Sequence, residues 1–190
     1  MVMDITSHTH HISQQYNNEL EAIRTHLSEM GGMAQRQVND AIQALIDADL
    51  ERAEQVVRAD TKVNSMEVTI DEECVRILAR RQPAASDLRL VIAVTKAITD
   101  LERIGDEATK IARQAIAMNK DGLSPRGYIE VRHIGGHVSR MLQDALDSFA
   151  RLDMELALNV VQTDKQVDME YATAMRELVT FMIEDPRSIT

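Results

Sequence analysis

The chain has 190 residues, of which 44 % are hydrophobic, and a net charge of −10, so it can form a core but repels the phosphate backbones of nucleic acids. Its single cysteine, Cys74, excludes an intramolecular disulfide. No stretch approaches the roughly 18 consecutive apolar residues of a membrane span, and residues 1–15 lack the pattern of a secretory signal, so we expect a cytoplasmic protein.

The pattern of apolar residues predicts an all-α protein. Aromatic residues make up only 3 % of the chain, and apolar residues recur at steps of three and four. Five long antiparallel helices are predicted, over residues 12–48, 49–81, 86–119, 128–151 and 154–184. Pro83 ends the second helix, Ser86 or Asp87 caps the third, and Pro186 closes the fifth.

The sequence contains an internal repeat. A shift of 104 residues aligns stretch 30–64 with stretch 134–168 and gives 12 identities, which include the glycine pairs Gly31-Gly32 and Gly135-Gly136. We predict a first three-helix bundle over residues 1–119, a linker over 120–127 and a second repeat over 128–190. The glycine pairs lie inside helices, where they indicate either close helix approach or a bend.

The second repeat lacks its third helix in this chain. Two helices of a three-helix unit leave an apolar groove uncovered, and such patches recruit partners or aggregate. We therefore expect either oligomerisation through this groove or a longer protein of which this chain is a part.

Two acidic pairs, each one turn apart, flank the apolar stripes of the second and third helices: Glu67 with Asp71, and Glu102 with Asp106. A short loop makes these helices antiparallel, so the pairs meet on one side of the seam. At about 1.5 Å per residue the carboxylates spread over roughly 14 Å. The four carboxylates are too far apart for one ion. Either they bind two or more metal ions, or only some of them are ligands. Oxygen ligands favour Mg, Ca or Mn and also accept iron. Alternatively, these acids form a solvated face or pair with neighbouring Arg and Lys.

Two histidines of the fourth helix, His133 and His137, also lie one turn apart. Glu130 with His133 matches half of a ferritin-like carboxylate site, but such an enzyme needs that motif twice. We interpret both histidines as surface or interface residues. A second histidine group, His8, His10 and His11, lies in the polar start of the chain, where adventitious metal capture is expected.

The chain resembles the PhoU family. The resemblance rests on the run 70–90, Ile-Asp-Glu-Glu-Cys-Val-Arg-Ile-Leu-Ala-Arg-Arg-Gln-Pro-Ala-Ala-Ser-Asp-Leu-Arg-Leu, and on Leu-Glu-Arg-Ile-Gly-Asp at 101–106. His-Ile-Ser-Gln-Gln at 11–15 and Met-Gly-Gly-Met at 30–33 extend it over nearly the whole chain. This sequence ends before a second Glu-Arg-Ile-Gly-Asp motif.

The resemblance implies two three-helix bundles with Glu/Asp-x-x-x-Asp motifs that hold multinuclear metal clusters in some members. It assigns Glu67, Asp71, Glu102 and Asp106 as metal ligands, with Mg, Mn, Fe or Zn as the metal. It further implies a cytoplasmic adaptor between the ATPase subunit of the phosphate ABC transporter and a sensor histidine kinase. Such an adaptor keeps phosphate-starvation genes off when phosphate is plentiful. The uncovered groove leads us to expect that the chain forms a homodimer or a higher oligomer.

No nucleophile with a positioned base, no glycine-rich phosphate loop and no nucleotide motif occurs in the sequence. We therefore expect a protein that is not an enzyme. Two alternatives remain: a carboxylate-bridged di-metal enzyme of the helical-bundle type, and a scaffold without metal.

Overall fold

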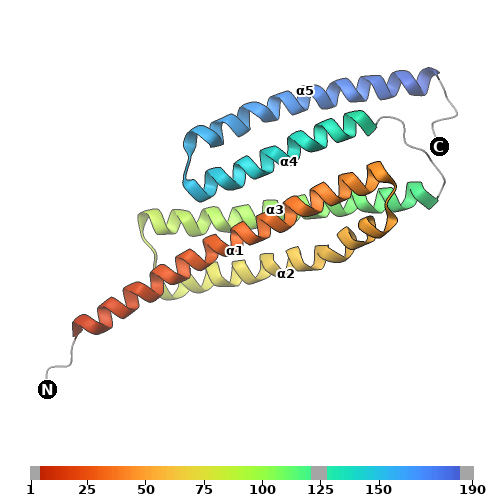
Figure 1. The fold of residues 1–190 in the computed structure, drawn as a ribbon. Coiled ribbons are helices and arrows are strands. Elements are labelled where there is room, and N and C mark those ends of the chain that lie inside the picture. The colour runs from red at the N-terminus through yellow and green to blue at the C-terminus, as the bar shows by residue number, and fades with distance from the viewer. Residues whose placement is uncertain (1–4, 121–127, 185–190) are drawn as a thin grey trace. The chain divides into compact units, whose positions relative to one another are not determined.

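The computed structural model describes residues 5–120 and 128–184. Its helices are α1 (Ile5–Asp47), α2 (Leu50–Arg81), α3 (Ala85–Lys120), α4 (Tyr128–Arg151) and α5 (Met154–Glu184) (Figure 1). No strand occurs in this described part, and the predicted all-α class is confirmed. α1 begins at Ile5 and not at residue 12, because neither Pro nor Gly interrupts this stretch.

The chain packs into two compact units that divide the first three helices partway along their length. Unit 1 contains Met1–Ala34 and Ala59–Asp106, and unit 2 contains Gln35–Arg58 and Glu107–Thr190. These units are packing regions and not the predicted sequence repeats. The predicted linker falls largely on residues outside the described part, so the boundary at 120–127 stays a prediction.

The core of unit 1 consists of aliphatic side chains at steps of three and four along each helix, as the sequence predicts. They are Ile23, Leu27 and Met30 of α1, Val63, Ile70 and Ile77 of α2, and Val91, Val94, Ile98 and Leu101 of α3. Cys74 is buried with them, and burial raises the pKa of its thiol. This cysteine is therefore a small core residue and not a reactive thiol.

An ion pair between Arg81 and Glu19 joins α1 to the end of α2 in unit 1. Arg81 donates from Nε to Glu19 Oε2 at 2.9 Å and from its terminal nitrogen to Glu19 Oε1 at 2.8 Å. The hydrogen bonds from Arg81 lower the pKa of Glu19. Two parallel charge-assisted bonds fix direction as well as distance, so this pair sets the register of the two helices.

Two helix-to-helix turns in unit 2 share one geometry. Ala48 and Leu152 both take left-handed conformations, with φ of 53° and 55°. The amide after each donates to the carbonyl five residues back, Asp49 to Ala44 at 3.0 Å and Asp153 to Ser148 at 2.9 Å. These positions are related by the same shift of 104 residues, which supports the internal duplication.

The aspartate in each turn caps the helix that follows it. Asp49 Oδ1 accepts from the Arg52 amide, and Asp153 Oδ1 accepts from the Leu156 amide, both at 3.0 Å. We expect Asp49→Ala and Asp153→Ala each to lower the free energy of unfolding by about 1 kcal/mol, measured by urea denaturation. Asp→Asn at either position keeps the acceptor and serves as the control. Alanine variants as stable as the asparagine variants would contradict the capping role.

The helix pair α4 and α5 in unit 2 lies side by side but leaves one side uncovered (Figure 1). No described residue of α5 is buried. Large apolar side chains are exposed along this helix: Leu158, Val161, Met169, Tyr171, Met175, Leu178, Val179, Phe181, Met182 and Ile183. The uncovered apolar surface predicted for the second repeat is therefore present.

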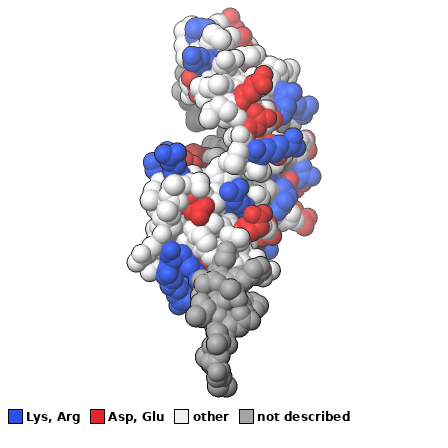
Figure 2. Space-filling model, turned by 90° about the vertical axis from the view of Figure 1, so that its left-hand side faces the viewer, with Lys and Arg blue, Asp and Glu red and all other residues white. Residues whose placement is uncertain are grey.

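None of the described helices is both long enough and apolar enough to cross a membrane. On the face of the molecule seen in Figure 2, acidic and basic side chains are mixed with uncharged ones. That face therefore does not present the continuous basic surface that nucleic-acid binding needs.

Candidate functional site

An acidic cluster lies on α2 and α3 within unit 1. Glu67, Glu102 and Asp106 are half-buried, whereas Asp71 is exposed. Glu102 and Asp106 follow the buried Leu101 and Gly105, so helix geometry places both at the edge of the apolar stripe. Three of the four predicted ligands thus lie where carboxylates lose part of their hydration.

Two further side chains on α2 add oxygen atoms that could bind a metal to this cluster. The sequence analysis did not assign them. Asp60 Oδ1 and Asn64 Oδ1 are both buried without a hydrogen-bond partner. Together with Glu67 and Asp71 they are spaced by four, three and four residues, which places all four on one helix face. This spacing is the feature of the sequence from which Asp60 and Asn64 could have been assigned to the cluster. Unpartnered buried oxygens are costly unless a donor or a cation meets them.

Within the acidic cluster, the carboxyl group of Glu102 has a raised pKa. Burial raises its pKa most, and the negative charges of Asp106, Glu67 and Asp60 raise it further, while Arg103 opposes them. Glu67 of α2 therefore lies close enough to Glu102 of α3 for their charges to interact, as the antiparallel register predicts. A bound cation would reverse this shift, because it favours the charged carboxylate.

The donor set of the acidic cluster consists only of carboxylate and amide oxygens. Such donors fit hard cations such as Mg and Mn, and they also accept iron. The four predicted ligands do not place three of their oxygens within 4.8 Å of one another, so side-chain movement would have to accompany binding. The assignment of Glu67, Asp71, Glu102 and Asp106 as metal ligands stays a prediction.

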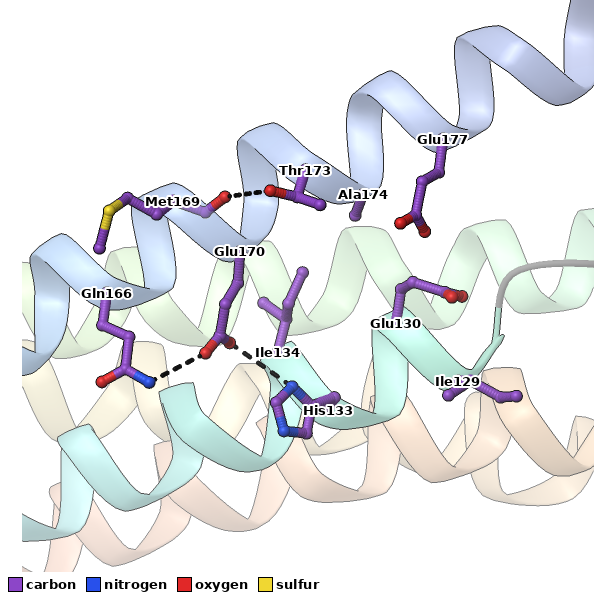
Figure 3. A pocket seen from close by; sticks show the side chains of 10 residues that line it. All are labelled: Ile129, Glu130, His133, Ile134, Gln166, Met169, Glu170, Thr173, Ala174 and Glu177. Carbon is purple, nitrogen blue, oxygen red and sulfur yellow. Dashed lines mark hydrogen bonds and ion pairs between the residues drawn. The ribbon is translucent and has the colours of Figure 1, made fainter.

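A second cluster lies between α4 and α5 in unit 2. His137 Nδ1 lies 2.9 Å from Glu170 Oε2, and His133 Nδ1 lies 3.5 Å from the same oxygen. In Figure 3, Glu170 projects from α5 towards His133 on α4, and Gln166 reaches the other carboxylate oxygen. His133, Glu170 and Gln166 border a cavity of about 500 Å³ that Glu130 and Glu177 also line.

The helices, the matching turns and the two side-chain clusters define an all-α protein with a duplicated helical hairpin. The PhoU domain model matches residues 27–115 and 131–189. The chain therefore belongs to the PhoU family.

Named relatives agree with this assignment. The chain is 65 % identical over 182 residues to the phosphate-specific transport system accessory protein PhoU homolog of Pseudomonas aeruginosa, covering 96 % of this chain and 75 % of that protein. The crystal structure of PhoU from Pseudomonas aeruginosa superposes with a TM-score of 0.89 at 64 % identity, covering 92 % of this chain and 83 % of that one. The phosphate transport system regulatory protein PhoU from Streptococcus pneumoniae gives a TM-score of 0.81 at 28 % identity, covering 90 % and 80 %.

Proposed function

We propose that this chain is a cytoplasmic accessory protein of phosphate transport. In this role it contacts the ATPase subunit of the phosphate ABC transporter and a sensor histidine kinase, and it keeps phosphate-starvation signalling and phosphate uptake low when phosphate is plentiful. The observation that carries the proposal is 65 % identity, over 96 % of this chain, to a protein named for phosphate-specific transport.

The proposed role is regulatory and not enzymatic. Relatives of the chain are named accessory and regulatory proteins. Long helices with mixed surface charge offer extended faces for protein contacts (Figures 1 and 2). An adaptor acts by changing which partner it occupies, so its activity depends on binding free energies and not on a reacting group.

We further propose that the acidic cluster binds metal ions of the Mg, Mn, Fe or Zn type through Glu67, Glu102 and Asp106, with Asp71 at its edge. The partnerless oxygens of Asp60 and Asn64 support this, because a cation satisfies them without a hydrogen-bond donor. The raised pKa of Glu102 supports it as well, because the carboxylates repel one another until a positive charge is present. Bound metal would neutralise the α2–α3 seam and stiffen unit 1.

We also infer that the chain forms a homodimer or a higher oligomer through the uncovered face of α5. The exposed fractions of Met169 and Ile183, 65 % and 74 %, support this, because apolar groups at such exposure are stabilised by a partner surface. Sedimentation velocity tests it: a concentration-dependent shift to a species of twice the mass is expected. A monomer at all concentrations would contradict it.

Binding measurements with purified components test the adaptor role. Immobilised chain is expected to capture the transporter ATPase subunit and the cytoplasmic part of the kinase, whereas an unrelated ATPase and an unrelated kinase pass through. Chelation of metal is expected to leave the chain folded and able to bind. Failure to capture either partner, with circular dichroism showing a folded helical chain, would contradict the proposal.

The same assay separates the adaptor from the two alternatives. A di-metal enzyme would lose turnover on chelation, whereas an adaptor has no turnover to lose. A scaffold without metal would bind its partners equally well when Glu102 and Asp106 are replaced by Gln and Asn, and it would show no thermal shift on addition of Mn²⁺ to the unaltered chain. The metal-binding adaptor is expected to show that shift.

A further inference from the structure

We propose that His133, His137 and Glu170 form a binding site for one divalent transition metal of the zinc type on α4 and α5. This site differs from the acidic cluster in its donors and in its position in the chain. It does not depend on the proposed role in phosphate transport.

The three side chains come together closely. Ligand atoms of His133, His137 and Glu170 all lie within 4.8 Å of one another, which holds for no other group of three His, Cys, Asp or Glu in the described residues. The two histidines lie one turn apart on α4, so their rings share one face, with centroids 4.5 Å apart. Both Nδ1 atoms face the same carboxylate oxygen of Glu170.

The spacing matches the coordination of zinc. Ligand bonds of about 2.0–2.1 Å at tetrahedral angles place neighbouring ligand atoms about 3.3–3.5 Å apart. The Glu170 oxygen lies 3.5 Å from the nitrogen of His133, which is within this range, and 2.9 Å from that of His137, which is slightly below it. Small rotations of exposed or half-buried side chains therefore suffice to accept an ion between them.

A neighbouring amide orients the carboxylate. Gln166 Nε2 donates to Glu170 Oε1 at 3.2 Å, which leaves Oε2 directed at the histidines (Figure 3). Hydrogen bonds of this kind to a ligating carboxylate fix its direction and strengthen metal sites. Gln166 lies one turn before Glu170 on α5, so the helix itself holds both groups in place.

The donor set selects the class of metal. Two imidazoles and one carboxylate suit Zn²⁺, Co²⁺ and Ni²⁺, whereas Mg²⁺ and Ca²⁺ take oxygen ligands. Three protein ligands leave a fourth position for water, as in open zinc sites. The adjoining cavity, about 500 Å³ in volume, provides room for that water.

The chain also contains an ordinary histidine–glutamate pair for comparison. His26 Nδ1 lies 2.8 Å from Glu73 Oε2, but residues 22 and 30, one turn away on either side, are Ala and Met. That pair has only two donors and is explained by a hydrogen bond alone. His26→Ala is therefore a matched control for loss of a His–Glu contact.

Calorimetric titration of the full chain with Zn²⁺ tests the site. Every sample carries His8→Ala, His10→Ala and His11→Ala, so that capture by the N-terminal histidines is removed. One Zn²⁺ is expected to bind at this site. His137→Ala, His133→Gln and Glu170→Gln are each expected to weaken its binding by more than about 10–100-fold, which is the effect of losing a group that only supports a ligand. His26→Ala is expected to leave the Zn²⁺ affinity unchanged.

The outcome that overturns the proposal is a Zn²⁺ affinity that none of the three variants changes. Loss of all Zn²⁺ binding in the Glu102→Gln variant would also overturn it, because the ion would then belong to the acidic cluster. The side chain of His133 is 64 % exposed, so His133→Gln is expected to fold normally, which circular dichroism verifies. The visible spectrum of the Co²⁺ form gives a second readout: intense tetrahedral bands are expected, and they are lost with His137→Ala.

Discussion

Replacement of Gly135 by valine is expected to lower the free energy of unfolding by about 1–3 kcal/mol. Gly135 is buried on α4 against Ile42 of α1, both in unit 2. A Cβ atom built at Gly135 would lie 2.5 Å from Ile42 Cδ1 and 3.2 Å from its Cγ2, so the whole isoleucine side chain has to move. Chemical denaturation followed by circular dichroism measures the loss.

The adjacent glycine provides the matched control. A Cβ atom at Gly136 meets nothing within 4 Å, so Gly136→Ala is expected to raise stability by about 0.5–1 kcal/mol through helix propensity. Shortening Ile42 to alanine is expected to remove most of the additional cost of valine at position 135, in a double-mutant cycle. Equal effects of valine at positions 135 and 136 would contradict the close approach of α1 and α4.

Glu102→Gln is expected to raise the melting temperature of the metal-free chain at pH 7. The folded chain raises the pKa of Glu102 above 4.5, through burial and through the charges of Asp106, Glu67 and Asp60. The folded state therefore binds the Glu102 proton more tightly than the unfolded state does. The stabilising contribution is complete below pH 4.5 and is lost as the pH rises through the raised pKa.

A neutral glutamine removes both the cost at neutral pH and the pH dependence. Melting curves between pH 4 and pH 8 are expected to diverge, with the variant gaining on the unaltered chain as pH rises. Glu72→Gln on α2, an exposed position, is the control and is expected to change little. A variant that is less stable than the unaltered chain at pH 7 without metal would contradict this electrostatic account.

Most of the fold follows from local patterns in the sequence. The steps of three and four between apolar residues identify the buried face of α3, for example, because Val91, Val94 and Ile98 follow these steps and are all buried. The matched turns could also be predicted from the sequence, because Asp49 and Asp153 occupy equivalent positions of the repeat and aspartate is a strong N-cap residue. Such features depend on neighbours within one or two turns, which sequence reveals directly.

Features that depend on how two helices rotate against each other were harder to predict. The acidic pairs placed Glu67 and Glu102 near each other, but Asp60 and Asn64 were not assigned, since only burial exposes their unpartnered oxygens as significant. The sequence analysis interpreted His133 and His137 as surface or interface residues. It did not pair them with Glu170, because Glu170 lies 33 residues beyond His137 on another helix. The rotation of α5 about its own axis decides that contact.

The measurement that tests the central claim most directly is repression of a phosphate-starvation promoter in a bacterium from which its own PhoU protein has been deleted. At high phosphate, expression of this chain is expected to return the reporter to the repressed level, and repression is expected to be lifted when phosphate is removed. A reporter that stays fully active at high phosphate, with the chain present, folded and abundant, would contradict the account.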